Sequence, residues 1–220
     1  MNELLLWQLA DSGFPSGGFT HSSGLEAAAQ FGHVRTAEDV WHVAVAVVRQ
    51  AGHGGLPFVR AAHRRPEDLP ALDGRVDLFL NQLVGNRASR AQGQALLDSA
   101  RRIFPDAGLE AIAGVVSEHG LRAHHAPLFG VVMSRVGVDA DKASELFLYQ
   151  AGRSVLGAAV RLGLLGVFES QRQQAALTHE ISATLTACRE LLPGEAAQTT
   201  PIVDLLQSTQ DRLYSRLFQS

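Results

Sequence analysis

The sequence predicts an all-α fold, a single globular bundle of about ten helices, and three observations support this prediction. Apolar residues recur at three- and four-residue spacing through most of the chain, whereas no stretch alternates with the period of a strand. Glycine and proline residues fall between the periodic segments, where they end or start helices. The length of 220 residues, with 46% hydrophobic and 19% charged residues, suits one globular domain.

The chain is expected to open with a short helix, a turn and a second helix. Leucines give residues 2–9 an apolar side, and residues 9–26 follow as LADSGFPSGGFTHSSGLE. The glycines of this stretch adopt positive φ without steric cost, so we expect a tight turn here. Ser22 or Ser23 is expected to cap the second helix, which ends at about residue 30. Glu26 would then lie in its first turn, where the helix dipole favours negative charge.

The next helix has clearer boundaries. Thr36 and Asp39 form a capping arrangement, and the helix that they start covers residues 37–50. Residues 52–55, Gly-His-Gly-Gly, are expected to break the chain. Pro57 then suits the first turn of another helix, because an N–H group has no helical partner at that position.

In the middle of the chain, helices alternate with glycine or proline stops. Pro105 ends one helix and Gly137 ends another. A central helix begins at Asp139 or Asp141 and extends to about residue 161, and its small polar surface predicts that it is buried. The helices expected before it cover residues 72–84, 87–104, 109–119 and 128–136.

The last part of the chain contains the longest expected helix, over residues 169–191. A linker follows at residues 194–200, and the final helix after it has an apolar face that reaches Leu217. We therefore expect a helical core over residues 1–193. The linker, helix and tail of residues 194–220 would pack on this core or on a partner.

Composition argues against several classes of function. The formal net charge of −3 gives no argument for binding nucleic acid or an anionic membrane. Cys188 is the only cysteine, which excludes a disulfide within the chain and a multi-cysteine zinc site. The sequence shows no secretory signal, and its longest apolar tract, residues 155–168, is interrupted by Arg161 and too short to span a bilayer. A cytoplasmic location is therefore expected.

No catalytic motif in the sequence is complete. The only lysine, Lys142, is not preceded by glycine, so a phosphate-binding Gly-Lys-Ser/Thr loop is missing. Ser16 misses the nucleophile elbow of hydrolases by one position. His179 and Glu180 start a zinc-protease pattern, but Ala183 stands where its second histidine is needed. We therefore expect no enzymatic activity, and an all-α enzyme with an unrecognised pocket is the less favoured alternative.

The densest group of histidines consists of His119, His124 and His125. Imidazole is a good ligand for nickel, zinc and copper, so a direct nickel-binding carrier is an alternative function. However, the spacing matches no known metal cage, and adjacent side chains diverge on a helix. We expect neither a bound metal nor a cofactor.

Five blocks of the sequence resemble, in the same order, segments of the UreF family of urease accessory proteins. The first block is the longest and the most specific. Val167 departs from the pattern, since a proline or a polar turn residue is expected after Gly166. The blocks are DSGFPSGGFTHSSGLE at residues 11–26, NRASRAQG at 86–93, HAPLFG at 125–130, AAVRLGLLG at 158–166 and YSRLFQS at 214–220.

This resemblance implies an all-α, homodimeric adaptor that has no catalytic activity of its own. Proteins of the family join UreD, called UreH in some organisms, and the GTPase UreG in a complex that delivers nickel to the urease apoprotein. The resemblance therefore implies that the chain bridges UreD and UreG and modulates GTP hydrolysis by UreG. It also implies that nickel passes through a tunnel in the complex.

Candidate partner-binding residues begin in the glycine-rich turn. Phe14 and Phe19 are aromatic anchors of the kind that dominates interface energetics, with His21 and Glu26 expected at a polar rim. In the alternative interpretation, the two phenylalanines hold the turn against the core of the same chain.

The other candidates lie in the central helix and in the tail. Arg153 and Arg161 interrupt an apolar helix, where each charge is costly unless it is paired within the chain or across a subunit interface. The tail is too apolar for a free chain end, so we expect it to become ordered when UreD binds. The candidate residues of the tail are Tyr214, Arg216, Leu217 and Phe218.

Overall fold

The computed structural model describes residues 3–220, and within this range the chain forms helices and no strand. The all-α prediction is therefore confirmed. The predicted start of the first helix at Asn2 lies outside the described residues. The α-helices are α1 (Glu3–Ala10), α2 (Leu25–Gln30), α3 (Ala37–Gln50), α4 (Leu56–Arg64), α5 (Leu69–Phe79), α6 (Leu83–Ile103), α7 (Leu109–Glu118), α8 (His125–Arg135), α9 (Ala140–Arg161), α10 (Val167–Ala187) and α11 (Pro201–Ser208).

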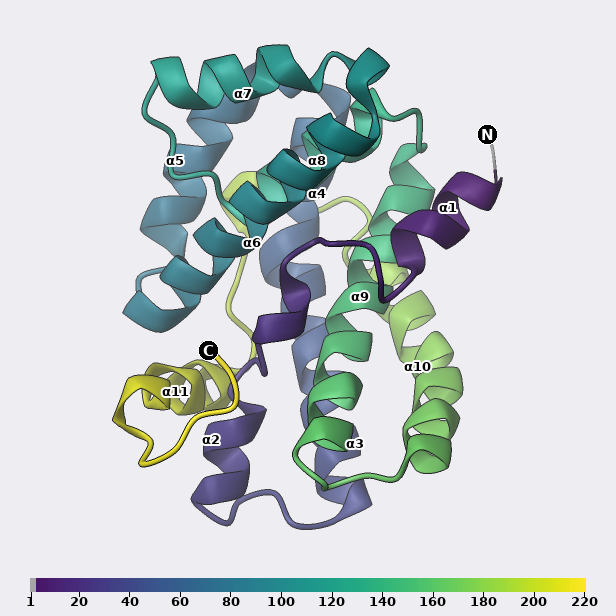
Figure 1. Cartoon of the computed structure of the whole chain (residues 1–220), viewed down its shortest axis with the longest axis vertical. Helices are drawn as coiled ribbons and strands as arrows, with labels where there is room; N and C mark the ends of the chain where they lie inside the picture. The colour runs from purple at the N-terminus through teal and green to yellow at the C-terminus, as the bar shows by residue number, and fades with distance from the viewer. Residues whose placement is uncertain (1–2) are drawn as a thin grey trace.

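Helix α9 lies at the centre of the molecule, packed against α3 and α10 (Figure 1). Towards one end, α4 packs on α8, α6 packs on both α8 and α7, and α5 contacts α4 and α8. Towards the other end, α11 packs on α6 and α2. The segment between α1 and α2 crosses α9, so the glycine-rich turn lies directly over the central helix (Figure 1).

Two of the expected helix starts are confirmed by their capping geometry. At α3, the Asp39 N–H donates to Thr36 Oγ1 at 3.1 Å, and the Thr36 N–H donates to Asp39 Oδ2 at 2.9 Å. This reciprocal capping box satisfies two N–H groups that the helix itself leaves without partners. At α9, the Lys142 N–H donates to Asp139 Oδ1 at 2.9 Å, which identifies Asp139 as the cap.

The predicted break at residues 52–55 is wrong. The chain continues from α3 into α4 through one wide helical turn, η2 (Ala51–Gly55). Close packing explains the glycines here. A Cβ atom on Gly52 would lie 2.2 Å from Thr184 Cγ2, and one on Gly55 would lie 2.6 Å from Phe147 Cε1. These glycines bring α10 and α9 close to the turn, as glycine allows where backbones approach.

Several helix ends also differ from the prediction. Gly24, with a φ of 82°, occupies the N-cap of α2, so neither Ser22 nor Ser23 does. The Ser22 hydroxyl nevertheless accepts a bond from the Glu26 N–H at 3.4 Å. The boundary between α5 and α6 lies a few residues earlier than expected, and α10 starts at Val167, directly after Gly166.

The final helix is much shorter than its apolar periodicity predicted. Helix α11 ends at Ser208, and a single 3₁₀ turn, η6 (Gln210–Arg212), follows it. Beyond this turn, the chain is extended and lies against the segment before α2. Long-range hydrogen bonds, described below, therefore outweigh the helical pattern of the tail.

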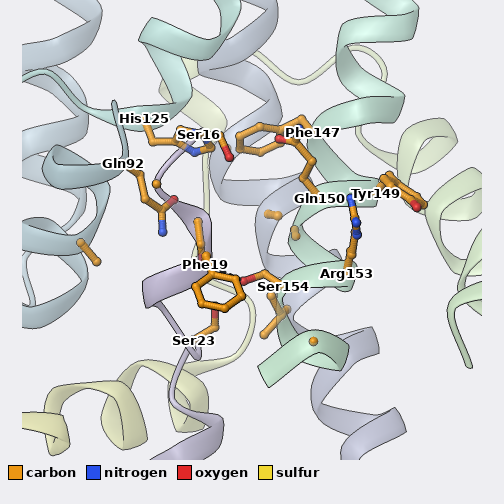
Figure 2. A pocket seen from close by; sticks show the side chains of 18 of the residues that line it. Ser16, Phe19, Ser23, Gln92, His125, Phe147, Tyr149, Gln150, Arg153 and Ser154 are labelled. Atoms are coloured by element: carbon orange, nitrogen blue, oxygen red, sulfur yellow. Dashed lines mark hydrogen bonds between the residues drawn. The ribbon is translucent and has the colours of Figure 1, made fainter. Parts of the chain in front are cut away.

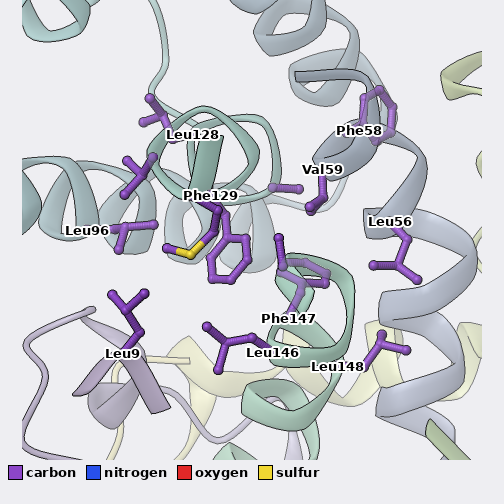
Figure 3. Packing of buried hydrophobic residues seen from close by; sticks show 14 of the residues in the cluster. Leu9, Leu56, Phe58, Val59, Leu96, Leu128, Phe129, Leu146, Phe147 and Leu148 are labelled. Carbon is purple, nitrogen blue, oxygen red and sulfur yellow. The ribbon is translucent and has the colours of Figure 1, made fainter. Parts of the chain in front are cut away.

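The core is a continuous cluster of aliphatic and aromatic side chains from most of the helices (Figure 3). The rings of Phe129 and Phe147 meet edge to face, with centroids 5.2 Å apart, where α8 contacts α9. Gly130 permits the close contact between α8 and α4, because a Cβ atom there would lie 2.2 Å from the Val59 carbonyl oxygen. None of the helices in residues 3–220 is long and apolar enough to cross a membrane.

Candidate partner-binding site around the glycine-rich turn

The glycine-rich turn has a defined shape that its sequence explains. Gly17 has a φ of 78°, which is accessible to glycine without strain. A Cβ atom at Gly17 would lie 2.8 Å from Ala95 Cβ, so the turn packs tightly on α6. The Gly13 N–H donates to Asp11 Oδ1 at 2.6 Å, and the Ser99 hydroxyl of α6 donates to the Pro15 carbonyl at 2.8 Å.

Residues 210–220, called the C-terminal segment below, are held by the carboxylate of Glu26. Glu26 accepts hydrogen bonds from the Leu217 N–H at 2.6 Å and the Phe218 N–H at 3.1 Å. It also accepts one from Gln210 Nε2 at 2.5 Å. The Glu26 side chain is buried, and these three donors satisfy it without a cationic partner.

A second set of hydrogen bonds holds the last residues of the C-terminal segment. The Ser22 N–H donates to the Ser220 carbonyl at 2.5 Å, and the Gln219 N–H donates to the Thr20 carbonyl at 2.8 Å. His21 Nδ1 lies 2.6 Å from the Ser220 hydroxyl. Burial, aided by the positive charge of Arg87, lowers the pKa of His21 to about 4, so its imidazole is neutral at pH 7.

Arg161 connects the central helix, the turn and the C-terminal segment. Its guanidinium carbon lies 3.9 Å from the ring centroid of Phe19 and 4.2 Å from that of Phe218. Its Nη1 donates to the Phe19 carbonyl at 2.5 Å, and its Nε donates to the Gly157 carbonyl at 3.3 Å. Burial lowers the pKa of Arg161 below its usual range. This stacking places a cation between two aromatic faces, an arrangement that is favourable on electrostatic grounds.

A cavity of about 800 Å³, called the central cavity below, lies behind the turn. The turn forms part of its wall, and Gln150, Arg153 and Ser154 line it from one face of α9 (Figure 2). Gln92 of α6 and His125 of α8 lie on another side (Figure 2). Its volume falls in the range of small-molecule sites, and its wall combines aromatic, amide, hydroxyl and guanidinium groups.

The candidate residues of the turn have different surroundings. Phe14 is buried and stacks on Phe104 with centroids 6.4 Å apart, so it holds the turn against the core. Phe19 is 69% exposed and is available to a partner. The exposed polar rim expected from His21 and Glu26 is wrong for the chain by itself, because both side chains are covered by the C-terminal segment.

The arginines in the central helix have carbonyl partners. Arg153 Nη1 donates to the Ala10 carbonyl, as Arg161 Nη1 does to that of Phe19. Within residues 3–220, neither arginine has a carboxylate within ion-pair distance. The internal salt bridge weighed from sequence is therefore not formed.

In the tail, Tyr214 and Leu217 are exposed, whereas Phe218 is buried. Arg216 Nη1 lies 3.0 Å from Asp211 Oδ1, and Arg87 of α6 contacts both carboxylate oxygens of the same residue. Sequence reasoning missed Asp211, Gln210 and Ser220 as parts of this site. Each pairs with a residue more than 120 positions away, and no local pattern signals such a contact.

The three histidines considered for nickel do not form a cluster. His124 is buried, with Nε2 3.1 Å from Asp77 Oδ1 and Nδ1 3.1 Å from the Ser89 hydroxyl. Burial lowers its pKa, although the hydrogen bond that His124 donates to Asp77 opposes this effect. His125 stacks against Phe147, and His119 is exposed on the end of α7. In the part of the chain that the structure describes, no three His, Cys, Asp or Glu residues are placed to hold a metal ion.

Comparison with known proteins identifies the family that the sequence blocks resemble. The sequence profile of the UreF family matches residues 34–178. The chain is 35% identical to "Urease accessory protein F" of Arabidopsis thaliana, over 97% of this chain and 91% of the relative. It is 29% identical to "Urease accessory protein UreF" of Trichodesmium erythraeum, over 98% of this chain and 96% of the relative. A profile match to more than half of the chain, together with such a relative, establishes the assignment: the chain belongs to the UreF family.

Proposed function

We propose that the chain is a urease accessory protein, a non-catalytic adaptor for nickel insertion. It bridges UreD or UreH and the GTPase UreG, modulates GTP hydrolysis by UreG, and works as a cytoplasmic homodimer. Its membership of the UreF family, whose curated relatives are named urease accessory proteins, carries this proposal. The absence of a complete catalytic motif in the sequence is consistent with a role based on protein contacts.

The geometry supports one surface for these contacts. Phe19, Tyr214 and Leu217 are exposed, and each belongs to a segment that hydrogen bonds fix in place. Exposed aromatic and aliphatic groups make effective anchors, because a partner that buries them removes apolar surface from water. We assign this surface, the turn with the C-terminal segment, to the contact with UreD.

The test is co-purification of the chain with its cognate UreD and UreG, followed by mass measurement of the complexes. We expect a homodimer alone and a larger complex with the partners. Failure to form any complex would contradict the adaptor function. Tight, stoichiometric nickel binding by the isolated chain in equilibrium dialysis would favour a carrier over an adaptor.

The double variant Tyr214→Ala, Leu217→Ala tests the assigned surface. Removing two anchors should weaken binding to UreD by at least about tenfold, because each such anchor contributes on the order of 1–2 kcal/mol. Leu78→Ala is the matched control, because Leu78 is 83% exposed and belongs to α5, not to the turn or the C-terminal segment. Equal affinity of the double variant and the control for UreD would contradict the assignment of this surface.

A further inference from the structure

The central cavity contains positive charge that no acidic residue neutralises. Arg153 and Arg161 both line it, and both are only partly exposed. They lie eight residues apart on α9, which corresponds to about 12 Å along the helix axis. A half-buried guanidinium is usually accompanied by a carboxylate, because burial removes the water that stabilises the charge.

The two acidic residues in the cavity wall have other partners. Asp11 accepts a hydrogen bond from the Gly13 N–H at 2.6 Å, and Asp204 accepts one from Gln50 Nε2 at 2.7 Å. Neither carboxylate comes within ion-pair distance of Arg153 or Arg161. The cavity therefore lacks an anion beside either guanidinium.

Hydrogen bonds to backbone carbonyls orient both guanidinium groups, and each group has further N–H donors without a partner in the described residues. Arg153 donates through Nη1 to the Ala10 carbonyl, and its Nε and Nη2 have no partner within the described residues. Arg161 contacts the rings of Phe19 and Phe218, and its Nη2 likewise has no hydrogen-bond partner in residues 3–220. A guanidinium fixed in this way loses little freedom when it binds a carboxylate.

The surroundings of Arg153 suit a polar ligand. Gln150 lies beside Arg153 on α9, because residues three positions apart are neighbours on a helix, and Ser154 lines the same cavity (Figure 2). Gln150 Nε2 donates to the Leu9 carbonyl at 3.0 Å, and the Arg153 contact with Ala10 holds the end of α1 in the same place. The end of α1 and the α9 face thus form a preorganised wall.

We propose that the central cavity binds a carboxylate group at Arg153. The carboxylate belongs either to a small organic acid or to an acidic side chain of a partner chain. Both sources present the same chemistry, a planar anion that accepts paired N–H donors. Arg153 itself lies on α9, outside the turn and the C-terminal segment that form the surface assigned to UreD.

Isothermal titration of the isolated chain with citrate, at ionic strength held constant with sodium chloride, tests the small-molecule source. We expect saturable binding to the wild type and affinity about tenfold weaker or worse in Arg153→Gln, since one charge-assisted contact is lost. Arg153→Lys, which keeps the charge and can still donate to Ala10, should show an intermediate affinity. Arg172→Gln is the control, because Arg172 is exposed on α10 and pairs with Glu169 outside the cavity. Circular dichroism of each variant confirms that it folds.

The partner source is tested by measuring the homodimer mass and UreD and UreG binding with Arg153→Gln. If citrate does not bind but this variant weakens one of these associations, the carboxylate comes from that chain and the proposal holds. If citrate binds the wild type and Arg153→Gln equally, or if Arg153→Gln changes neither citrate binding nor association, the proposal is overturned. Arg153-dependent citrate binding by a chain that forms no complex would refute the adaptor function alone.

Discussion

Glu26 shows how one side chain can organise distant parts of the chain. Its carboxylate is 2% exposed, yet its partners are two backbone N–H groups and one side-chain amide, all from the C-terminal segment. A buried carboxylate is costly unless its oxygen atoms receive hydrogen bonds, and a carboxylate only accepts. A carboxylate therefore suits this position, because both of its oxygen atoms accept and three N–H donors point at them.

The substitution Glu26→Gln tests this match. A glutamine amide has the same size, but its NH₂ group would face N–H donors, leaving at least one buried donor without an acceptor. We expect a loss of about 1–3 kcal/mol in the free energy of unfolding, measured by denaturant titration. Glu118→Gln is the control, because Glu118 is exposed at the end of α7 and should tolerate the change. A Glu26→Gln variant as stable as the wild type would contradict this account.

The buried imidazole of His125 should make the stability of the folded chain sensitive to acid. Burial, together with the charge of His21, lowers the pKa of His125 to about 4, whereas an unfolded histidine titrates near 6.5. Between these values, the unfolded chain binds the proton and the folded chain does not. Stability is therefore complete above pH 6.5 and falls as the pH is lowered towards 4. The size of this effect is on the order of 3 kcal/mol for such a shift.

The variant His125→Phe should reduce that loss. Phenylalanine preserves the stacking on Phe147 and removes the titrating group. Denaturant titrations at several pH values should show a shallower decline between pH 6.5 and 4 than in the wild type. His119→Gln should decline like the wild type, because His119 is exposed. Parallel pH profiles for His125→Phe and the wild type would show that this histidine does not contribute.

At the scale of elements, glycine positions determine how closely the helices pack. At Gly130, the backbone of α4 occupies the space that a Cβ atom needs, whereas at Gly114 of α7 nothing lies within 4 Å. The two glycines look alike in sequence, since each lies inside a helix. Only the packing distinguishes a required glycine from a replaceable one.

Alanine substitutions at these two positions should have opposite effects. Gly130→Ala forces α4 and α8 apart and should cost at least about 2 kcal/mol, as overpacked sites do. Gly114→Ala should add about 0.5–1 kcal/mol, because alanine restricts the unfolded chain and favours the helix. Thermal unfolding followed by circular dichroism measures both changes. Similar melting temperatures for the two variants would be inconsistent with the packing described.

The helices that the sequence predicted best are those whose signals are local. The capping box of Thr36 and Asp39 was predicted correctly, and Asp139 is one of the two residues expected to start the central helix; both caps depend on residues three positions apart. The break at residues 52–55 was predicted wrongly, because glycine can serve either a turn or a close contact. The final helix was predicted too long because backbone N–H groups of residues 217–219 bond to Glu26 and Thr20 instead of forming helical hydrogen bonds.

At the scale of the whole molecule, the site depends on contacts between the two ends of the chain. The Ser22 N–H binds the Ser220 carbonyl, and Arg161 stacks between Phe19 and Phe218. Family resemblance in the sequence pointed to the turn and the tail separately. It did not reveal that they pair, because hydrogen bonding across nearly 200 residues leaves no periodicity in the sequence.

This arrangement sharpens the prediction that UreD orders the tail. The C-terminal segment is attached by hydrogen bonds to the turn and by the buried side chains of Leu213 and Phe218, while Tyr214 and Leu217 remain exposed. Because fewer of its side chains are buried, this segment opens more easily than the buried helix α9. Covering Tyr214 and Leu217 with a partner would add apolar burial and suppress this opening.

Amide hydrogen exchange should therefore be faster in residues 213–220 than in α9, and should slow on addition of UreD. The amides of α9 serve as the internal control, and equal protection of residues 213–220 with and without UreD would contradict the prediction.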